Sequence, residues 1–407
     1  MRTTNHLHGA FTPVIVSCAL LALSVAEGRL RATGDRLSGS CAATGSGVCR
    51  YVAPTGSDAN PGTSAAPFRT LQQAANVVQP GDVVVVADGV YTGGSTIVDI
   101  TRSGTAAAWI VFEAAHRGGA VIDGQQNSSA IGVEIGGAYI RVQGFEVRGT
   151  SHYGIEAYHG HDVVVAANDV HAIGRYCTST SAGIVGINAY VPNMTIERNV
   201  VHDVGRYASG EHGCTPSNAY WQNHDHGVYQ GEGDHLLVRN NVFYDLTHGW
   251  AIQRYDGSGT VVNGLTIVNN TFVGANPNKV GQIIIATATT NLLIANNIFY
   301  QPNTAGIWLD AGGVTGTVTH NLTYGGDVLY SPGISLSALL GTGLNLVTNV
   351  LNADPLLVNV TGADFHLLAG SPAVDAGMPL SIVSDDFDGT SRPQGGGYDI
   401  GAFELIP

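Results

Sequence analysis

Ionisable and aromatic residues are densest in one stretch of the chain, between His224 and Asp256. Its polar members are His224, Asp225, His226, Tyr229, His248, Gln253, Arg254 and Asp256. Histidine, tyrosine and arginine are the side chains that remove protons, donate them and neutralise developing negative charge. Because clustered ionisable residues are costly to a fold that does not use them, we predict a catalytic or binding site here.

Two further chemistries draw on the same part of the chain. Glycoside hydrolysis needs two carboxylates beside the scissile bond, and those available are Asp225, Glu232, Asp256 and Asp310. A His-x-His pair places both rings on one strand face, so an alternative transition-metal set is His224, His226 and His248. The sequence contains no phosphate-binding loop and no nucleophile elbow.

A repeated pattern indicates the elements that position these residues. Six times, a short apolar strand ends in Asn and another apolar pair follows; the asparagines are Asn168, Asn199, Asn241, Asn270, Asn297 and Asn321. Their spacing of 24 to 42 residues is typical of a solenoid whose units must stack to bury their apolar faces. We predict an all-β parallel β-helix in which Asn adopts left-handed backbone at a corner and bonds to the Asn one coil away.

The strand that begins each coil gives a register for the side chains. Alternation predicts an inward row of Ile155, Ile187, Val228, Ile252 and Ile307. The outward row is then Glu156, Asn188, Tyr229, Gln253 and Trp308. Polar and aromatic residues in one exposed row suit a sugar chain, which offers hydroxyls and CH faces, although ordinary surface residues are the alternative.

Two repeats are interrupted by insertions that both begin with the residues GRY. The insertions carry one cysteine each, and two more cysteines lie together before the first strand: Cys177, Cys214, Cys41 and Cys49. Since no C-x-x-C zinc pattern occurs, we predict the disulfides Cys177–Cys214 and Cys41–Cys49. We also expect the insertions to wall the site with Arg175, Arg206 and His212.

The N-terminal segment resembles an export signal. Residues 1–26 have a positive start, an apolar run and the small-residue exit Ser24-Val25-Ala26, which predict a signal peptide and a secreted protein. A lipoprotein cleavage site at Cys18 is the alternative. Residues 27–48 are then a linker, and no other segment could span a membrane.

The two ends of the solenoid differ from its coils. Helical spacing of apolar residues predicts a short capping helix, built on Phe68, Leu71, Ala74, Ala75 and Val78. We assign residues 49–350 to the β-helix with this N-terminal cap, and residues 351–407 to a C-terminal cap segment. Within it, Asp386-Phe387-Asp388-Gly389 suits an Asp-Gly turn, or less readily a calcium site.

Composition narrows the partners. The chain has 407 residues, 55 glycines, 12% charged residues and a net charge of −14, which favours short strands and turns over ion-paired helices. Such an acidic chain repels nucleic acid, so we exclude that partner, and we expect a monomer that contacts an extracellular polysaccharide.

Three segments resemble secreted right-handed parallel β-helix proteins of the pectate-lyase-like superfamily. They are YVAPTGSDANPGTSAAPFRTLQQAANVVQPGDVVVVADGVYTG, NHDHGVYQGEGDHLLVRNNVFYDLTHGWAIQRYDG and the closing DFDGTSRPQGGGYDIGAFE. The resemblance covers nearly all of the chain after the signal, and it implies a groove along one sheet where a polysaccharide lies across several coils. Because fold does not fix function, it is less specific for the reaction.

The resemblance implies β-elimination at a uronate sugar, sometimes with calcium and often with a Lys or Arg base. The single lysine, Lys279, lies in a turn, which disfavours a lysine base. We predict His226, Tyr229 and Arg254 as catalytic residues. The predicted substrate-binding residues are His224, Asp225, His248, Gln253, Asp256, Asn188 and Trp308. The alternatives are a hydrolase acting on a neutral glycan and a non-catalytic glycan-binding or surface scaffold protein.

Overall fold

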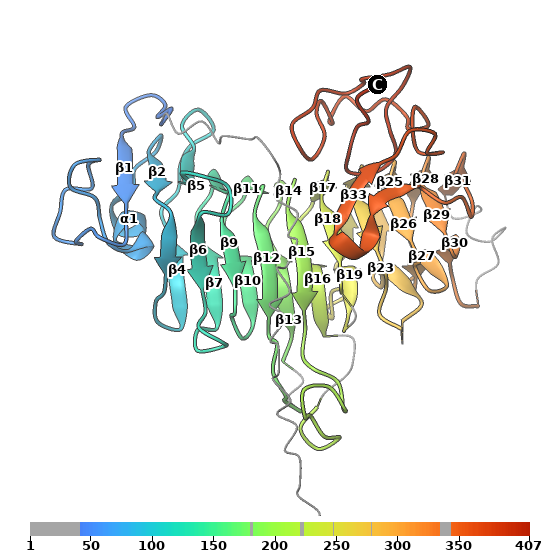
Figure 1. Ribbon diagram of the computed structural model, residues 1–407, viewed down its shortest axis with the longest axis horizontal. Coiled ribbons are helices and arrows are strands. Elements are labelled where there is room, and N and C mark those ends of the chain that lie inside the picture. Colours follow the sequence, from blue (N-terminus) through green and yellow to red (C-terminus); the bar gives the residue numbers. More distant parts are fainter. Residues whose placement is uncertain (1–40, 180–181, 220–223, 247, 278, 334–342) are drawn as a thin grey trace, which may run out of the picture.

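The chain winds into an elongated parallel β-helix with three faces, as the sequence predicted (Figure 1). The computed structural model describes residues 41–179, 182–219, 224–246, 248–277, 279–333 and 343–407. The predicted signal peptide, the alternative site at Cys18 and most of the predicted linker lie outside these residues. None of the described helices has the length and apolar character that a membrane span requires.

Three parallel sheets run the length of the molecule, and each coil adds one strand to each of them. The long sheet consists of β1 (Cys49–Val52), β2 (Val83–Val86), β5 (Ile110–Ala114), β8 (Ile140–Gln143), β11 (Val163–Ala166), β14 (Met194–Glu197), β17 (Leu237–Arg239), β21 (Thr266–Val268), β25 (Leu292–Ala295), β28 (Gly316–Thr319) and β31 (Leu344–Val347). The flank sheet consists of β3 (Gly89–Tyr91), β6 (Ala120–Asp123), β9 (Glu146–Arg148), β12 (Asp169–Ile173), β15 (Val200–Val204), β18 (Val242–Tyr244), β22 (Thr271–Val273), β26 (Ile298–Tyr300) and β29 (Leu322–Tyr324).

The third sheet carries the candidate site and is called the site sheet. It consists of β4 (Thr96–Ile100), β7 (Ile131–Ile135), β10 (Tyr153–Ala157), β13 (Ile184–Ala189), β16 (Asp225–Gln230), β19 (Trp250–Arg254), β23 (Gly281–Ile285), β27 (Ala305–Leu309) and β30 (Asp327–Tyr330). Two small pairs complete the strands, β20 (Val262–Asn263) with β24 (Thr289–Thr290) and β32 (Leu357–Asn359) with β33 (Asp364–Leu367), and η1 (Val360–Gly362) is a 3₁₀ turn.

The core is a stack of aliphatic side chains at equivalent positions of successive coils. On the site sheet the paired inward row is Ile155, Ile187, Val228, Ile252, Ile283 and Ile307, and each is fully buried. The predicted inward row is therefore confirmed. Burying one such side chain contributes about 1.5–3 kcal/mol, so the rows of the three sheets together stabilise a long, narrow core.

The repeated asparagines form a buried ladder where each long-sheet strand turns into a flank-sheet strand. The backbone N–H and the Nδ2 of Asn241 both donate to Oδ1 of Asn270, at 2.9 Å each, and Asn270 bonds to Asn297 in the same way. The ladder continues beyond the six predicted members to Asn349. The predicted bonding between coils is thus confirmed.

The expected backbone conformation of the ladder residues is wrong, however. Positive φ falls on the residue before each ladder Asn, for example 57° at Arg198 and 52° at Asn269. The Asn itself must keep an ordinary backbone so that its amide side chain points into the corner.

The predicted helix is α1 (Leu71–Val77), with Thr70 as its N-cap. Leu71, Ala74 and Ala75 are buried in the main core. Gln72 exchanges hydrogen bonds with the backbone of Asp99 in β4, accepting from its N–H at 2.8 Å and donating to its C=O at 3.2 Å. Since β4 is the edge strand of the site sheet, α1 satisfies backbone groups that the first coil leaves open.

Residues 351–407 were predicted as a cap, and they lie along the side of the solenoid instead. Their apolar residues, such as Phe365, Phe387 and Phe403, pack on Val200, Val242, Val273, Ile298 and Leu322 of five neighbouring flank-sheet strands. Figure 1 shows this segment above the later coils. Asp386 accepts hydrogen bonds from the backbone N–H groups of Asp388, Thr390 and Glu404, which makes the Asp-Gly segment a turn.

The C-terminal segment contains a histidine that links stability to pH. Asp388, 2.7 Å from Nε2, and Asp364, 2.6 Å from Nδ1, raise the pKa of His366 to about 9. We expect this stabilisation to be complete below pH 6.5 and to be lost between about pH 6.5 and 9. Because the His366 side chain is 40% exposed, water screens these ion pairs, and their contribution to the free energy of unfolding is about 1 kcal/mol at most.

The variant His366→Gln tests this link by chemical unfolding at several pH values. The variant should be less stable than the wild type at pH 6 and nearly equal to it at pH 10, where the wild-type imidazole is neutral. An equal difference at both pH values would contradict the electrostatic explanation.

Candidate functional site

A cavity of about 420 Å³ opens on the outward face of the site sheet, over the coils where the insertions leave the solenoid. Its described lining is Tyr153, Gly183, Val185, Asn188, Tyr190, His224, His226, Tyr229, Gln253, Tyr255, Ile284, Ala286 and Asp310. Five of these were predicted site residues: Asn188, His224, His226, Tyr229 and Gln253.

The predicted outward row is confirmed by strand pairing. Glu156, Asn188, Tyr229, Gln253, Ile284 and Trp308 are register partners on successive strands from β10 to β27. Neighbouring strands lie about 4.8 Å apart, so the row presents one side chain per coil along the axis of the solenoid. This arrangement matches an extended polymer that lies across several coils.

His226 and Tyr229 both line the cavity and lie three residues apart on β16. Their ring centroids are 5.7 Å apart, and Tyr229 also stacks on Tyr190 of the preceding coil at 5.9 Å. Burial, with the neighbouring Tyr190, raises the pKa of Tyr229 well above its ordinary value. Tyr229 is thus a neutral phenol near neutral pH, as ordinary tyrosine is, and the shift weakens it as an acid; its O–H can still donate to a strongly basic oxygen.

Two amide side chains flank Tyr229 in the outward row and offer buried acceptors. Asn188 donates from Nδ2 to Glu156 at 2.8 Å, which directs its Oδ1 away from that carboxylate. In the described part of the structure, neither Oδ1 of Asn188 nor Oε1 of Gln253 accepts a hydrogen bond. Buried acceptors without donors are costly, and the hydroxyl groups of a sugar would supply the donors.

Arg254 was predicted as catalytic, and the structure does not bring it into the cavity. It follows outward-facing Gln253, so strand alternation turns its side chain to the interior, where it is fully buried. Its guanidinium donates to the carbonyls of Gly231, at 2.7 Å, and Thr260, at 2.6 Å. These contacts hold two turns of the solenoid together.

Asp225 and His248 were predicted to bind substrate, and both contact the insertions instead. Asp225 forms a buried ion pair with Arg206, which also donates its backbone N–H to the same carboxylate at 2.8 Å. His248 contacts Glu211 through Nε2 at 2.7 Å and Arg175 through Nδ1 at 3.1 Å. They hold the insertions and do not line the cavity.

The remaining predicted residues, Asp256 and Trp308, are not among the described lining residues, and neither is Lys279, which was disfavoured as a base. Asp256 accepts hydrogen bonds from Ser258 and Thr260 in its own turn, and these bonds lower the pKa of its carboxyl. Trp308 is in the outward row and packs on Trp250, with centroids 5.4 Å apart. Lys279 is in a turn and is not among the described lining residues.

Both predicted disulfides are present. Cys41–Cys49 precedes the first coil, and Cys177–Cys214 joins the two insertions. The second disulfide therefore fixes the wall of the cavity as one unit.

Three tyrosines of the cavity were missed by the sequence analysis. Tyr153 is two positions before an inward isoleucine, while Tyr190 and Tyr255 follow the ends of their strands. The sequence pattern that could have identified them is that each tyrosine begins, or directly follows, a strand of the site sheet.

The predicted transition-metal set and a calcium site in the cavity are both unsupported by the described residues. Among the described residues, the group with metal-ligand proximity is Asp169, His171 and His202 on the flank sheet, not the predicted His224, His226 and His248. In the cavity, calcium would find one carboxylate, Asp310, and the amide oxygens of Asn188 and Gln253. Calcium takes six to eight oxygen ligands, so these described residues do not form a calcium cage by themselves.

Comparisons with known proteins agree with this architecture. Residues 50–212 match the family model "Pel9A-like, right handed beta helix region", and residues 209–353 match the model "Right handed beta helix region". The uncharacterized protein YwoF of Bacillus subtilis (strain 168) is 25% identical over 337 residues, which are 65% of this chain and 71% of that protein.

Pectate lyases are among the relatives. Pectate lyase L of Dickeya dadantii (strain 3937) is 25% identical over 371 residues, covering 84% of this chain and 81% of that protein. The crystal structure of pectate lyase Pel9A superposes with a TM-score of 0.58 at 20% identity, covering 88% of this chain and 96% of that one. At this identity the structural likeness establishes the fold.

Proposed function

Because this chain is a pectate-lyase-like right-handed parallel β-helix protein, we propose that it is a secreted enzyme that cleaves an extracellular uronate polysaccharide by β-elimination. The observation that carries the proposal is the pairing of His226 with Tyr229 in a cavity on the site sheet. The two disulfides support export, since such bonds persist in oxidising compartments.

In the proposed reaction, His226 is the base. Its imidazole removes the proton at C5 of the uronate, the C5–H electron pair forms the C4=C5 double bond, and the bond from C4 to the leaving oxygen breaks. A neutral imidazole has a ring nitrogen with a lone pair, which is the atom that accepts this proton. Tyr229, whose pKa burial raises, donates its phenolic proton to the leaving oxygen.

The rest of the cavity binds and orients the chain. The free oxygens of Asn188 and Gln253 accept hydroxyl hydrogen bonds on either side of Tyr229. Tyr190 and Tyr255 offer aromatic faces to the CH faces of the sugar rings. Since the outward row runs along the solenoid, the polysaccharide lies parallel to its axis.

One observation favours a second candidate, a hydrolase that acts on a neutral glycan. No Arg or Lys occurs among the described lining residues, so His224 and His226 are the side chains there that can carry positive charge. A hydrolase needs two carboxylates within about 10 Å. Asp310 lines the cavity and directly follows β27, the strand of Trp308. Glu156 lies on β10, five strands away in the site sheet, so strand spacing separates it from Asp310 by roughly 24 Å. These two carboxylates are therefore too far apart to act as the pair.

A substrate panel separates the two candidates. The purified protein is incubated with pectate, alginate and other uronate polymers, in calcium and in chelator, while the ultraviolet absorbance of the unsaturated product is followed. We expect absorbance to rise on at least one uronate polymer. If no uronate polymer gives unsaturated product and a neutral glycan releases reducing ends, the hydrolase replaces the lyase. If neither occurs, the protein is a binding or scaffold protein.

A further inference from the structure

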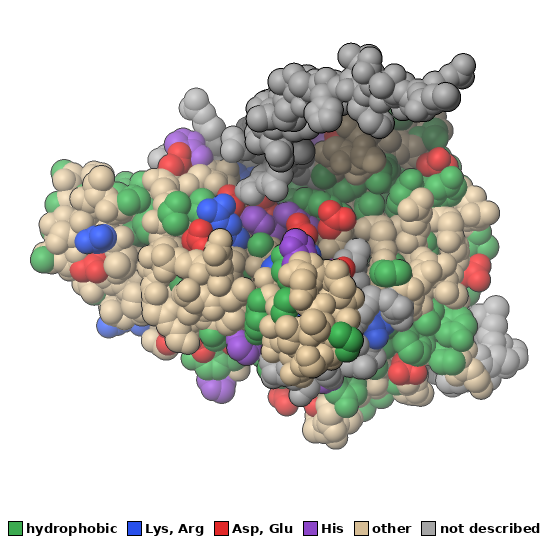
Figure 2. All heavy atoms as spheres, turned by 60° about the horizontal axis from the view of Figure 1, so that its bottom comes forward, with side chains coloured by type: hydrophobic (Ala, Val, Ile, Leu, Met, Phe, Trp, Pro, Cys, Tyr) green, Lys and Arg blue, Asp and Glu red, His purple; other side chains and the backbone are tan. Residues whose placement is uncertain are grey.

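A second group of ionisable side chains lies on the flank sheet, away from the cavity. His171 of β12 and His202 of β15 are register partners, and their rings stack with centroids 4.8 Å apart and an interplanar angle of 2°. Both side chains are largely buried. Figure 2 shows histidines gathered with acidic and basic side chains near the middle of one face of the molecule.

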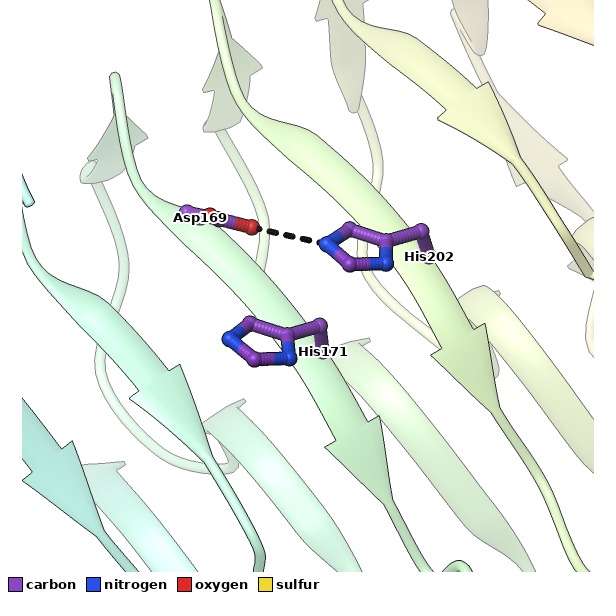
Figure 3. A group of neighbouring side chains, drawn as sticks. All are labelled: Asp169, His171 and His202. Carbon is purple, nitrogen blue, oxygen red and sulfur yellow. Dashed lines mark ion pairs between the residues drawn. The ribbon is translucent and has the colours of Figure 1, made fainter. Parts of the chain in front are cut away.

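A carboxylate completes the group. One ligand atom of Asp169 and one of each histidine all lie within 4.8 Å of one another. Oδ1 of Asp169 is 3.2 Å from Nε2 of His202, a distance that also allows an ion pair when the imidazole is protonated. Figure 3 shows the two rings parallel, with the outer nitrogens on the side where Asp169 lies.

The surroundings orient these side chains in the way metal ligands are oriented. Asp203 holds Nδ1 of His202 at 2.9 Å, which leaves Nε2 directed at Asp169. A carboxylate on the far nitrogen of a ligating histidine is the usual supporting contact of metal sites. Glu146, the register partner of Asp169, lies 3.1 Å from Nε2 of His171 and accepts a hydrogen bond from Arg148 at 2.7 Å, so it orients His171 from outside the group of three.

We propose that Asp169, His171 and His202 bind one transition-metal ion of the zinc type. Imidazole nitrogen with carboxylate oxygen suits Zn²⁺ and its first-row neighbours, whereas calcium prefers a set made of oxygens alone. The ion would join β12 to β15, the two strands that precede the insertions. A hollow of about 530 Å³ lies beside the group and is lined by Arg148 and Ala172, but by none of the three proposed ligands.

Ring stacking combined with ion pairs is the competing explanation, because Asp169 and Asp203 both contact the imidazole of His202. Arg148, His171, His202 and Tyr244 occupy one register row, and the ring of Tyr244 stacks on His202 at 4.5 Å. Such a structural role would use both carboxylates to hold His202 in place, and it predicts that no metal binds.

The test uses the full chain without an affinity tag, stripped with chelator and titrated with Co²⁺. We expect one equivalent to give the visible absorption bands of four- or five-coordinate cobalt. Zn²⁺ should displace it, and a large excess of Ca²⁺ should not. His171→Asn and His202→Asn should abolish the bands, and Asp203→Asn should weaken binding about 10–100-fold.

The matched control is His161→Asn, because His161 also contacts a carboxylate, that of Asp162 at 2.6 Å, but belongs to no such group. It should bind cobalt like the wild type. Circular dichroism and thermal unfolding establish that each variant is folded. The proposal would be overturned if the cobalt bands persist in the folded variants His171→Asn and His202→Asn. It would also be overturned if the wild-type protein shows no bands.

A crystal grown with zinc gives a second measurement that needs no variant. An anomalous difference peak between the two histidines and Asp169 supports the site. A zinc-soaked crystal with no peak there refutes it, whatever the behaviour of the variants.

Discussion

The variant His226→Ala is expected to lose about 100-fold or more of the lyase activity while keeping the wild-type fold. A positioned general base contributes about 10²–10⁴-fold to the rate, and no second imidazole in the described lining is as buried as that of His226. The effect should appear in kcat, because the base acts on the bound sugar. The measurement is initial velocity on the most active polymer of the panel, together with circular dichroism.

His152→Ala is the matched control, since His152 lies on the same side of the solenoid and does not line the cavity. It should keep full activity. The companion Tyr229→Phe keeps the ring that stacks on Tyr190 and removes the proton donor, so it should lower kcat with little change in KM. Wild-type kcat in folded His226→Ala would remove the histidine from the mechanism.

The second large effect concerns stability. Asn270→Ala should destabilise the solenoid by about 3 kcal/mol or more, because it leaves several buried groups without partners, each at a cost of about 1–3 kcal/mol. The N–H and Nδ2 of Asn241 lose their acceptor, and the carbonyls of Val238 and Val268 lose a donor. Urea unfolding followed by circular dichroism measures the loss.

Asn345→Ala serves as the control for this experiment. Asn345 lies on β31 of the long sheet, and its side chain is exposed. We expect a change within about 0.5 kcal/mol, as for most surface substitutions. If both substitutions change the free energy of unfolding by the same amount, the hydrogen bonds of the ladder contribute little more to stability than the hydrogen bonds to water that replace them in the unfolded chain.

Much of the scaffold was predictable because it depends on local, repeated patterns. The ladder of Asn168 to Asn321 follows from one residue type at one place in each coil, and the outward row follows from strand alternation. The disulfide between Cys177 and Cys214 followed from two insertions with similar beginnings. In each case, the residues that contact one another occupy equivalent positions in successive coils.

Strand alternation also excludes Arg254 from the cavity. Adjacent residues of a strand face opposite sides, so an outward Gln253 requires an inward Arg254. Asp225 was not predictable in this way, because its partner Arg206 belongs to an insertion that no repeat describes. Its role depends on how a loop folds back, and a single sequence gives no pattern for that.

The histidine pair of the flank sheet was also within reach of the sequence. His171 and His202 each stand three residues after a ladder asparagine, Asn168 and Asn199, so one alignment places them on neighbouring strands. Attention to the density of polar residues favoured the later coils instead. Periodic alignment of each residue type is therefore the better guide in a solenoid.

The alternation of the site sheet has a consequence for how such proteins diversify. Every inward position of the row from Ile155 to Ile307 holds an Ile or Val of similar size, while the adjacent outward positions range from Glu156 to Trp308. Residues that fill the core and residues that face outward thus alternate along each strand. A mutation at an outward position can therefore change the surface of the site sheet in one coil and leave the packing of the core unchanged.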